Sequence, residues 1–245
     1  MKSVIVITPS VGRSTLPQAI KSVAKQSYPN IQHLIVADGP TYYGEVYSAV
    51  GKTDVEVQIA LSPNNTGKNG FYGHRIYAAY SHLVDQDYVV FLDEDNWFET
   101  HHIENLVNLC EEKQLDFAYS LRQVFIGDEF HAFDMCESIG RWPIWFTQDA
   151  PDPQPSSYLV DTSAYCFKRE WLIQNAHLWH SGWGGDRRFF EAVMWDAKYD
   201  TTGLHTLCYR LPDMQKAYGG DMTFFERGNE AVKKHYGGKY PWLKT

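Results

Sequence analysis

Three acidic residues stand together directly after a short hydrophobic stretch. Asp93, Glu94 and Asp95 follow residues 88–92, whose continuous apolar sequence is typical of a buried strand. Crowded carboxylates repel one another unless a cation neutralises them, and hard oxygen ligands suit Mg²⁺ or Mn²⁺. From the motif alone two interpretations stay open: a metal ion that holds a diphosphate, or an acidic turn that is solvated at the end of a strand.

Four further residues have the chemistry of a binding or catalytic site. Asp38 ends the apolar run 33–37, where its carboxylate either accepts an N–H from a base or belongs to an ordinary Asp-Gly turn. Arg75 lies early in a predicted helix and faces either a base or phosphate, or solvent. Asp186 follows two glycines at a predicted helix start, which makes it either an N-cap or a general base on a mobile turn. The nearby indole of Trp183 suits stacking on a sugar ring as well as ordinary packing.

Strand-like and helix-like segments alternate along the chain. Strands are predicted at residues 4–8, 33–37, 55–61, 88–92, 117–126, 158–167 and 204–211, and helices at 15–27, 72–84, 100–113, 168–175, 186–199 and 224–235. Such alternation predicts an open, mainly parallel sheet whose ligands bind beyond the carboxyl ends of the strands. We therefore expect Asp38 and Asp93 on one rim, and we expect residues 140–157, rich in Trp and Pro, to form a lid or acceptor loop.

The composition narrows the class of protein. The chain has 245 residues, of which 44% are hydrophobic and 21% charged, as in a globular protein, and its net charge of -8 argues against a nucleic-acid partner. Neither a signal peptide nor a transmembrane segment is predicted, and the four cysteines are scattered, so a cytoplasmic location is expected. No feature of the sequence specifies an oligomeric state.

Several motifs occur in the order found in one enzyme family. They cover roughly the first 105 residues and comprise Thr8-Pro9-Ser10-x-x-Arg13 after an apolar run, Gln26-Ser27-Tyr28-Pro29-Asn30, Ala37-Asp38-Gly39, Asn64-Asn65-Thr66-Gly67, Arg75 and Phe91-Leu92-Asp93-Glu94-Asp95. With these motifs the sequence resembles the family 2 glycosyltransferases. The resemblance implies the GT-A fold, a Rossmann-like three-layer α/β/α domain with a mainly parallel mixed central sheet.

The resemblance also implies a role for each matching residue. It places Thr8, Pro9, Asp38 and Arg75 around a uracil-type base, Asp93 and Glu94 at the ribose and diphosphate, Asp95 with Asp93 on Mn²⁺ or Mg²⁺, and Trp183 and Gly185 at the acceptor sugar. Asp186 would take the proton of an acceptor hydroxyl while that hydroxyl displaces the nucleoside diphosphate with inversion. The implied donor is a UDP-sugar, and the implied acceptor is a glycan, a lipid-linked sugar or another hydroxyl compound.

The resemblance further implies that residues 1–245 form a single domain. Its parts would be a nucleotide-sugar-binding half (1–115), an acceptor-binding and catalytic half (116–215), and a C-terminal loop and helix (216–245). Two alternatives stay open. The family more usually has an acid where Gly185 stands, which favours a module that binds a sugar nucleotide or glycan without turnover. The spacing Asp93-x-Asp95 is similar to that of haloacid-dehalogenase-type phosphatases, in which the first Asp is phosphorylated.

Overall fold

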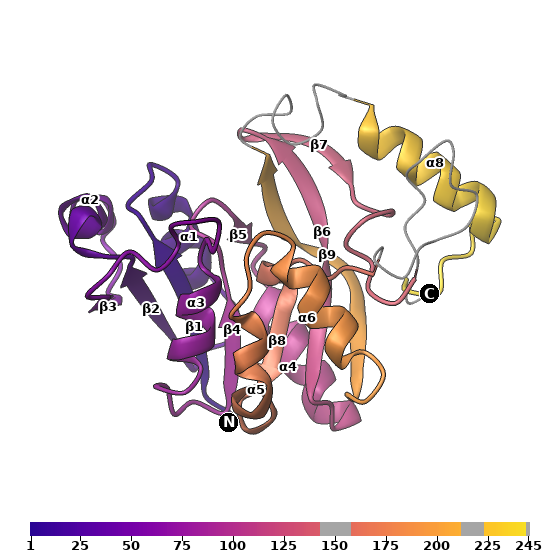
Figure 1. Cartoon of the computed structure of the whole chain (residues 1–245). Coiled ribbons are helices and arrows are strands. Elements are labelled where there is room, and N and C mark those ends of the chain that lie inside the picture. Colours follow the sequence, from indigo (N-terminus) through magenta and orange to yellow (C-terminus); the bar gives the residue numbers. More distant parts are fainter. Residues whose placement is uncertain (143–157, 212–222, 244–245) are drawn as a thin grey trace.

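A single mixed sheet organises the computed structural model, which describes residues 1–142, 158–211 and 223–243. Its order in this part of the chain is β3-β2-β1-β4-β8-β6-β9-β5, with β7 paired to β6 (Figure 1). The strands are β1 (Val4–Ser10), β2 (Ile31–Ala37), β3 (Gln58–Leu61), β4 (Tyr88–Phe91), β5 (Trp97–Phe98), β6 (Phe117–Ile126), β7 (Glu129–Phe133), β8 (Tyr165–Lys168) and β9 (Tyr199–Leu211). The predicted α/β fold with a mainly parallel mixed sheet is confirmed.

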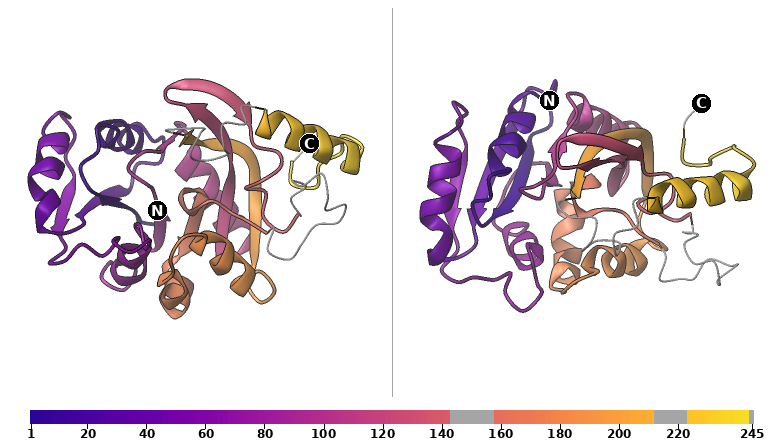
Figure 2. Two further views of the ribbon diagram at one scale, coloured as in Figure 1. Left: turned by 45° about the horizontal axis from the view of Figure 1, so that its top comes forward. Right: turned by 90° about the horizontal axis from the view of Figure 1, so that it is seen from above.

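Helices cover both faces of this sheet. They are α1 (Leu16–Ala24), α2 (Tyr43–Val50), α3 (His74–Tyr80), α4 (His102–Lys113), α5 (Arg169–Asn175), α6 (Gly185–Val193) and α8 (Phe224–Tyr236), with short 3-10 turns η1 (Pro40–Tyr42), η3 (Thr162–Ala164) and η4 (Ala176–Trp179). In Figure 1, α5 and α6 lie in front of the strands and α4 behind them, and the view from above in Figure 2 separates the same layers. The helices therefore shield the sheet on both sides.

Aromatic rings fill the layer between the sheet and α6. Trp179 of η4 stacks on Phe189 of α6 with ring centroids 4.4 Å apart, and its edge meets Phe91 of β4 at 5.3 Å. Phe167 of β8 contacts Phe91 and Phe189 at 5.3 and 5.6 Å. All four side chains are fully buried. Because offset and edge-on ring contacts add to the hydrophobic gain, this cluster fixes α6 firmly against the sheet.

The direction of the strands decides which residues meet at one rim. β1, β2 and β4 are parallel, so their carboxyl ends, followed by Asp38 and Asp93, lie at the same edge. β8 is antiparallel to β4 and begins at that edge. The residues that precede β8, including Asp161, therefore reach the rim where the parallel strands end.

Several predicted elements need correction. Helix α2 and strand β7 were not expected from the sequence, and residues 158–164 precede β8 as irregular chain and a 3-10 turn rather than as strand. The predicted helix 186–199 ends at Val193, because Tyr199 already pairs with Phe117 and begins β9. Of the expected loop 140–157, residues 143–157 lie outside the described part of the chain.

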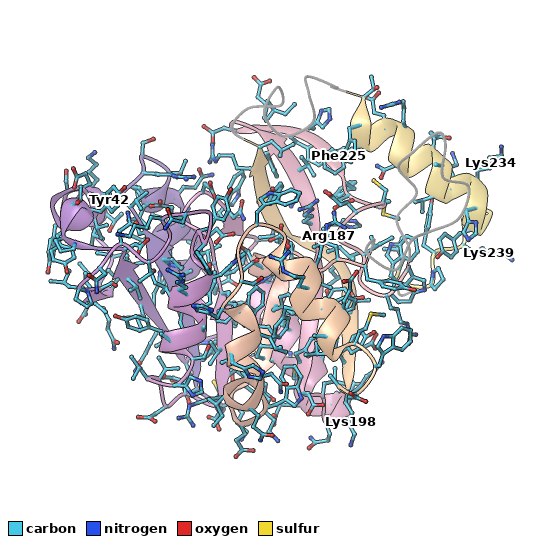
Figure 3. All side chains as sticks on the ribbon, in the orientation of Figure 1. Tyr42, Arg187, Lys198, Phe225, Lys234 and Lys239 are labelled. Atoms are coloured by element: carbon cyan, nitrogen blue, oxygen red, sulfur yellow. The ribbon has the colours of Figure 1, made fainter. Side chains whose placement is uncertain are left out.

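The C-terminal helix α8 lies beyond β7, at the opposite end of the molecule from β3 (Figures 1 and 2). Phe225 on α8 is buried on the side toward β7 (Figure 3). The side chain of Asn229 accepts a hydrogen bond from the backbone of Met135 at 3.0 Å and donates one to that of Phe133 at 2.8 Å. Within the described residues, every helix is too short or too polar to span a lipid bilayer.

Candidate functional site

A cleft of about 820 Å³ opens at the rim where β1, β2 and β4 end. The acids that the sequence analysis singled out all line it: Asp38, Asp93, Glu94, Asp95 and Asp186. These residues come from segments up to about 150 positions apart in the sequence, so the fold alone brings them together. Asp161 from the lead-in to β8 also lines the cleft, with the basic side chains of Arg13, Lys68, Arg122, Arg187 and Arg210.

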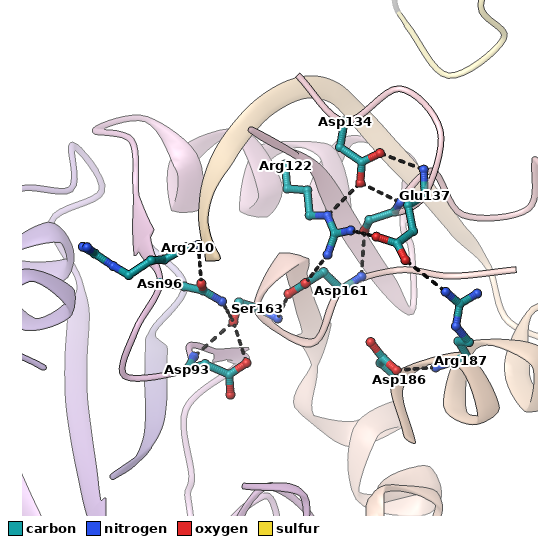
Figure 4. A network of polar contacts seen from close by, with 11 residues as sticks. Asp93, Asn96, Arg122, Asp134, Glu137, Asp161, Ser163, Asp186, Arg187 and Arg210 are labelled. Atoms are coloured by element: carbon teal, nitrogen blue, oxygen red, sulfur yellow. Dashed lines mark hydrogen bonds and ion pairs between the residues drawn. The ribbon is translucent and has the colours of Figure 1, made fainter. Parts of the chain in front are cut away.

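Asp93 is held at the end of β4 by two hydroxyl groups. Tyr77 donates to its Oδ1 at 2.8 Å. Ser163 donates to its Oδ2 at 3.4 Å, and the Asp93 N–H donates to the Ser163 hydroxyl at 3.0 Å (Figure 4). Burial and the neighbouring charges of Asp95 and Asp161 raise the pKa of Asp93 to about 7. The carboxyl group is therefore partly protonated near neutral pH unless a nearby positive charge lowers its pKa.

Glu94 and Asp95 have different hydrogen-bond partners. Glu94 accepts hydrogen bonds from the backbone N–H groups of Val11, Gly12 and Arg13 at 3.1 to 3.2 Å and from the hydroxyl of Ser10 at 2.6 Å. Its carboxylate is thus committed to the turn after β1. Asp95 instead faces the cleft, where Arg13 donates to its Oδ2 at 2.6 Å. Burial raises the pKa of Asp95 despite the attraction of that guanidinium group.

Asp38 fastens the loop that follows β3. Its Oδ1 accepts hydrogen bonds from the backbone N–H and the hydroxyl of Thr66, at 2.6 and 2.8 Å. Its Oδ2 accepts the N–H of Gly67 at 2.9 Å, and a Cβ at Gly67 would stand 2.8 Å from that oxygen. Only glycine fits this approach. Asp38 lines the cleft, so it can still offer an acceptor position to a bound base.

Two predicted base contacts, Thr8 and Arg75, are not among the described residues that line the cleft. Thr8 is fully buried, and its hydroxyl hydrogen-bonds Nε2 of His33 at 2.9 Å. Successive residues of a strand point to opposite faces, so Pro9 reaches the cleft where Thr8 does not. The guanidinium group of Arg75 lies 3.3 Å over the ring of Phe71 and contacts the Thr66 carbonyl at 3.4 Å. In this structure Arg75 supports the loop that Asp38 fastens.

Asp186 is the second residue of α6 and faces the cleft. Its carboxylate accepts a hydrogen bond from the backbone N–H of Arg187 at 2.9 Å. Burial, together with the charge of Asp161, raises the pKa of Asp186 to about 6. A carboxylate with a pKa close to the working pH is well suited to accept a proton from a hydroxyl group in a reaction.

The turn before Asp186 exposes Trp183 and buries Gly185. Trp183 lines the cleft with 78% of its surface exposed. Gly185 is buried and is not among the described residues that line the cleft, so its contact with an acceptor sugar stays a prediction. A Cβ at Gly185 would lie 2.6 Å from Nδ1 of His74. The imidazole ring therefore occupies the space that a side chain at position 185 would need.

A buried arginine network was missed in the sequence. Arg122, 3% exposed, donates hydrogen bonds to Asp134 at 2.7 Å, to Asp161 at 2.9 Å, and to Glu137 (Figure 4). Glu137 also pairs with Arg187, the residue after Asp186, at 3.2 Å. The one available signal was an arginine within the mainly apolar strand segment 117–126, because a charge in a buried strand needs a partner.

Arg210 near the end of β9 is a second missed residue. Its backbone N–H donates to Asn96 at 3.0 Å, and its Nε donates to the backbone carbonyl of Asp95 at 3.1 Å. Its guanidinium group also lies 4.8 Å from the centre of the Trp97 ring and pairs with Asp128 at 2.8 Å. Arg210 thus brings a positive charge to the acidic edge of the cleft.

The donor atoms near Asp93 and Asp95 suit a hard divalent cation. Both side chains reach the cleft with carboxylate oxygens, the ligand type that Mg²⁺ and Mn²⁺ prefer. Within the described residues, no cluster of three or more His, Cys, Asp or Glu side chains forms a complete metal site. A cation held here would need further oxygens, which a diphosphate carries.

Comparisons with known proteins agree with the fold. The fold resembles crystal structures of S. aureus TarS: residues 1–349 in complex with UDP (TM-score 0.61, 13% identity, 89% of this chain and 62% of that one) and in complex with UDP-GlcNAc (TM-score 0.62, 12% identity, 87% and 59%). A longer TarS structure matches with a TM-score of 0.61 and 12% identity over 89% of this chain and 38% of its own.

The chain thus spans about 60% of the TarS fragments and less of the longer protein. No curated protein sequence gives a significant match. A family model described as glycosyl transferase family 2 matches residues 3–190, which include every acid of the cleft. The chain belongs to glycosyl transferase family 2.

Proposed function

We propose that this chain transfers a sugar from a UDP-sugar to a hydroxyl group of an acceptor, with inversion at the anomeric carbon. The observation that carries the proposal is the meeting of Asp38, Asp93, Asp95 and Asp186 in one cleft. The half 1–115 would bind the nucleotide sugar and the half 116–215 the acceptor, because the cleft draws its lining from both. The UDP and UDP-GlcNAc complexes of TarS support the choice of donor.

The donor would lie along the acidic rim with its base toward Asp38. We place Pro9 beside the base, Asp93 at the ribose, and Asp95 with Asp93 on Mn²⁺ or Mg²⁺. A bound divalent cation would neutralise the charge that develops on the departing diphosphate. Asp95 must first share or release the guanidinium group of Arg13, now 2.6 Å away, which then becomes available to the diphosphate.

Asp186 would act as the general base. It removes the proton of the acceptor hydroxyl while the hydroxyl oxygen forms a bond to the anomeric carbon and the bond from that carbon to the diphosphate breaks. Its position at the start of α6 and its pKa of about 6 support the role. The exposed indole of Trp183, on the turn just before it, would stack on an acceptor sugar.

The two alternatives have less support than a transferase. Gly185 stands in place of an acid because His74 fills the adjacent space, so its presence needs no loss of catalysis to explain it. The match of residues 3–190 to glycosyl transferase family 2 favours a transferase over a phosphatase of the haloacid-dehalogenase type.

The test combines calorimetry with a transfer assay. UDP, GDP and TDP are titrated with and without Mn²⁺, and UDP-glucose, UDP-galactose and UDP-GlcNAc are then assayed with a panel of soluble methyl glycosides as acceptors. We expect Asp186→Asn to lower the transfer rate about 10²- to 10⁴-fold, the usual contribution of a general base. Its affinity for UDP should stay within a factor of two of the wild type, because Asp186 lies on the acceptor side.

The opposite pattern would count against the proposal. An Asp186→Asn variant that transfers sugar at the wild-type rate removes Asp186 from the mechanism. If UDP binds equally well with and without Mn²⁺, Asp95 does not hold a cation that UDP binding requires. Asp85→Asn is the matched control, because that carboxylate is 97% exposed and lies outside the cleft.

A further inference from the structure

The turn at residues 181–184 carries Trp183 and leads directly into Asp186. It joins η4 to α6 and contains Gly182 and Gly184, the latter with φ of 74°. Glycines leave a chain segment conformationally free, so such a turn has no fixed shape of its own. Any precise placement of the indole must therefore come from contacts made by side chains elsewhere.

Arg188 makes those contacts from the first turns of α6. Its Nε donates to the hydroxyl of Ser181 at 2.7 Å, and its Nη2 donates to the carbonyl oxygens of Gly182 at 3.0 Å and Trp183 at 2.7 Å. One guanidinium group thus binds three consecutive residues. Because its donors are arranged in a rigid planar fork, this pattern restricts the path of the backbone through the turn.

A second contact closes the other side of the turn. Nδ1 of His74 on α3 donates to the carbonyl oxygen of Ser181 at 2.8 Å, which requires the proton to be on that nitrogen. The turn also lies against the preceding glycine-rich loop, since a Cβ at Gly182 would stand 3.1 Å from the carbonyl oxygen of Gly70. The turn is therefore braced from α3 while Arg188 fastens it from α6.

We propose that Arg188 is a positioning residue for the acceptor: it fastens the 181–184 turn and so fixes the Trp183 indole at the mouth of the cleft, beside Asp186. The part of this inference that concerns the acceptor rests on the proposed function, whereas the fastening of the turn by Arg188 does not. Arg188 is not among the described residues that line the cleft, so it acts through the turn and not on the substrate. An acceptor sugar then meets an indole that is already in place, and less freedom is lost on binding.

The experiment compares Arg188→Ala, Arg188→Lys, Trp183→Ala and the double variant Trp183→Ala/Arg188→Ala. Arg169→Ala is the matched control: Arg169 likewise donates to backbone, at the Val84 carbonyl, but it follows β8 at the edge of the sheet away from the cleft. Two quantities are measured: hydrogen exchange of the amides of residues 182–186 in the ligand-free protein, and the KM values for the UDP-sugar and the methyl glycoside selected above.

We expect Arg188→Ala to accelerate exchange at residues 182–186 and to raise the acceptor KM about tenfold, with the donor KM within a factor of two. Arg188→Lys should recover part of the acceptor effect. The double variant should be no worse than Trp183→Ala alone, because both changes remove the same ordered indole. Arg169→Ala should leave both KM values and this exchange unchanged.

Additive effects in the double variant, or equal losses for donor and acceptor, would overturn the proposal. Failure of the proposed function would be recognised by a different result, because the wild type would then transfer no sugar from any donor tested. Hydrogen exchange would in that case decide alone: acceleration at residues 182–186 in Arg188→Ala supports the fastening, and unchanged exchange refutes it.

Discussion

The charge of Asp161 acts on three other carboxylates of the cleft. It contributes to the raised pKa values of Asp93, Asp95 and Asp186, and its own carboxylate is paired with Arg122 at 2.9 Å. A single side chain therefore sets part of the electrostatic environment of both the rim and the proposed base. Its position before an antiparallel strand explains how it reaches them.

Replacing Asp161 by Asn should move the acidic limb of the pH profile of kcat/KM to lower pH. Removing that negative charge makes ionisation of Asp186 easier, so the pKa of Asp186 falls from about 6 toward the ordinary value. We expect a displacement of about half to one pH unit. Kinetics between pH 5 and 9 measure it, with Asp85→Asn as the control. A limb that does not move would show that Asp186 does not set it.

Replacing Asp93 by Asn should stabilise the ligand-free protein at high pH. The pKa of Asp93 is raised in the folded state to about 7, so the folded protein holds this proton more tightly than the unfolded chain. The contribution of Asp93 to the free energy of unfolding therefore declines as pH rises from about 4 to above 7, and the variant lacks that decline. Urea unfolding in EDTA should give a gain on the order of 1–3 kcal/mol at pH 8.5 and a smaller one at pH 5.5. Equal gains at both pH values would contradict the assignment.

The acids of the proposed site were predictable to different degrees. Asp93 and Asp95 follow an apolar strand, and the spacing of motifs around Asp38 adds family resemblance, so sequence patterns reach these residues. Asp161 carries no such pattern, and Arg122 has only the signal of a charge within a mainly apolar strand segment. Their pairing depends on β8 running against β4 and beside β6, a tertiary arrangement that the sequence does not encode locally.

At the scale of elements, Arg122 connects four parts of the chain. It reaches from β6 to Asp134 and Glu137 after β7 and to Asp161 before η3, and Glu137 continues the chain of ion pairs to Arg187 on α6. Asp134 is itself fixed by the backbone N–H groups of residues 136–138. The network thus ties the segment after β7 to the helix that carries Asp186.

Arg122→Met should destabilise the protein strongly. It leaves three carboxylates, one of them fully buried, without their shared positive charge, and breaking a buried ion pair from one side costs about 3–5 kcal/mol. Chemical denaturation measures the loss. Lys233→Met is the control, because among the described residues that side chain forms an exposed pair with Glu230 at 3.7 Å. Equal stability of the two variants would mean that the network contributes nothing.

Elements that pack against the sheet were easier to predict than those at its margins. Strands β1 and β4 are continuous buried apolar runs and α1 has a clear apolar face, so their patterns are strong. Helix α2 buries only Val46 and Ala49, and β7 has no fully buried residue. Short elements with so little buried surface leave a weak periodic signal, which is why both escaped prediction.

At the scale of the whole molecule, the residues that line the cleft come from both the first and the second half of the chain. Asp38, Asp93 and Asp95 come from the first half, and Asp161 and Asp186 from the second. A ligand that contacts both halves stabilises the folded state, because the unfolded chain cannot bind it. The stability of the entire chain therefore reports on occupation of the cleft.

UDP with Mn²⁺ should raise the Tm of the wild type. At a hundred times its Kd a ligand contributes about 2.7 kcal/mol, which corresponds to about 5–10 °C for a chain of this length. Thermal unfolding with UDP alone, Mn²⁺ alone and both together measures the effect, and the pair should exceed the sum of the two. Asp95→Asn should abolish that excess while keeping the effect of UDP alone. An unchanged Tm under all conditions would contradict nucleotide binding.

The hydrogen bonds of Asp38 to Thr66 and Gly67 limit the number of acceptor positions that it can offer to a nucleobase. A carboxylate offers about four lone-pair positions, and three here are taken by the loop, so one position on Oδ2 is left. A single remaining acceptor can bind one ring N–H. Every nucleobase carries an N–H group, in the ring or on an exocyclic nitrogen, that could fill this position, so the position restricts the number of hydrogen bonds and not the identity of the base. If Asp38 meets the base as proposed, the loop leaves it room for one such hydrogen bond.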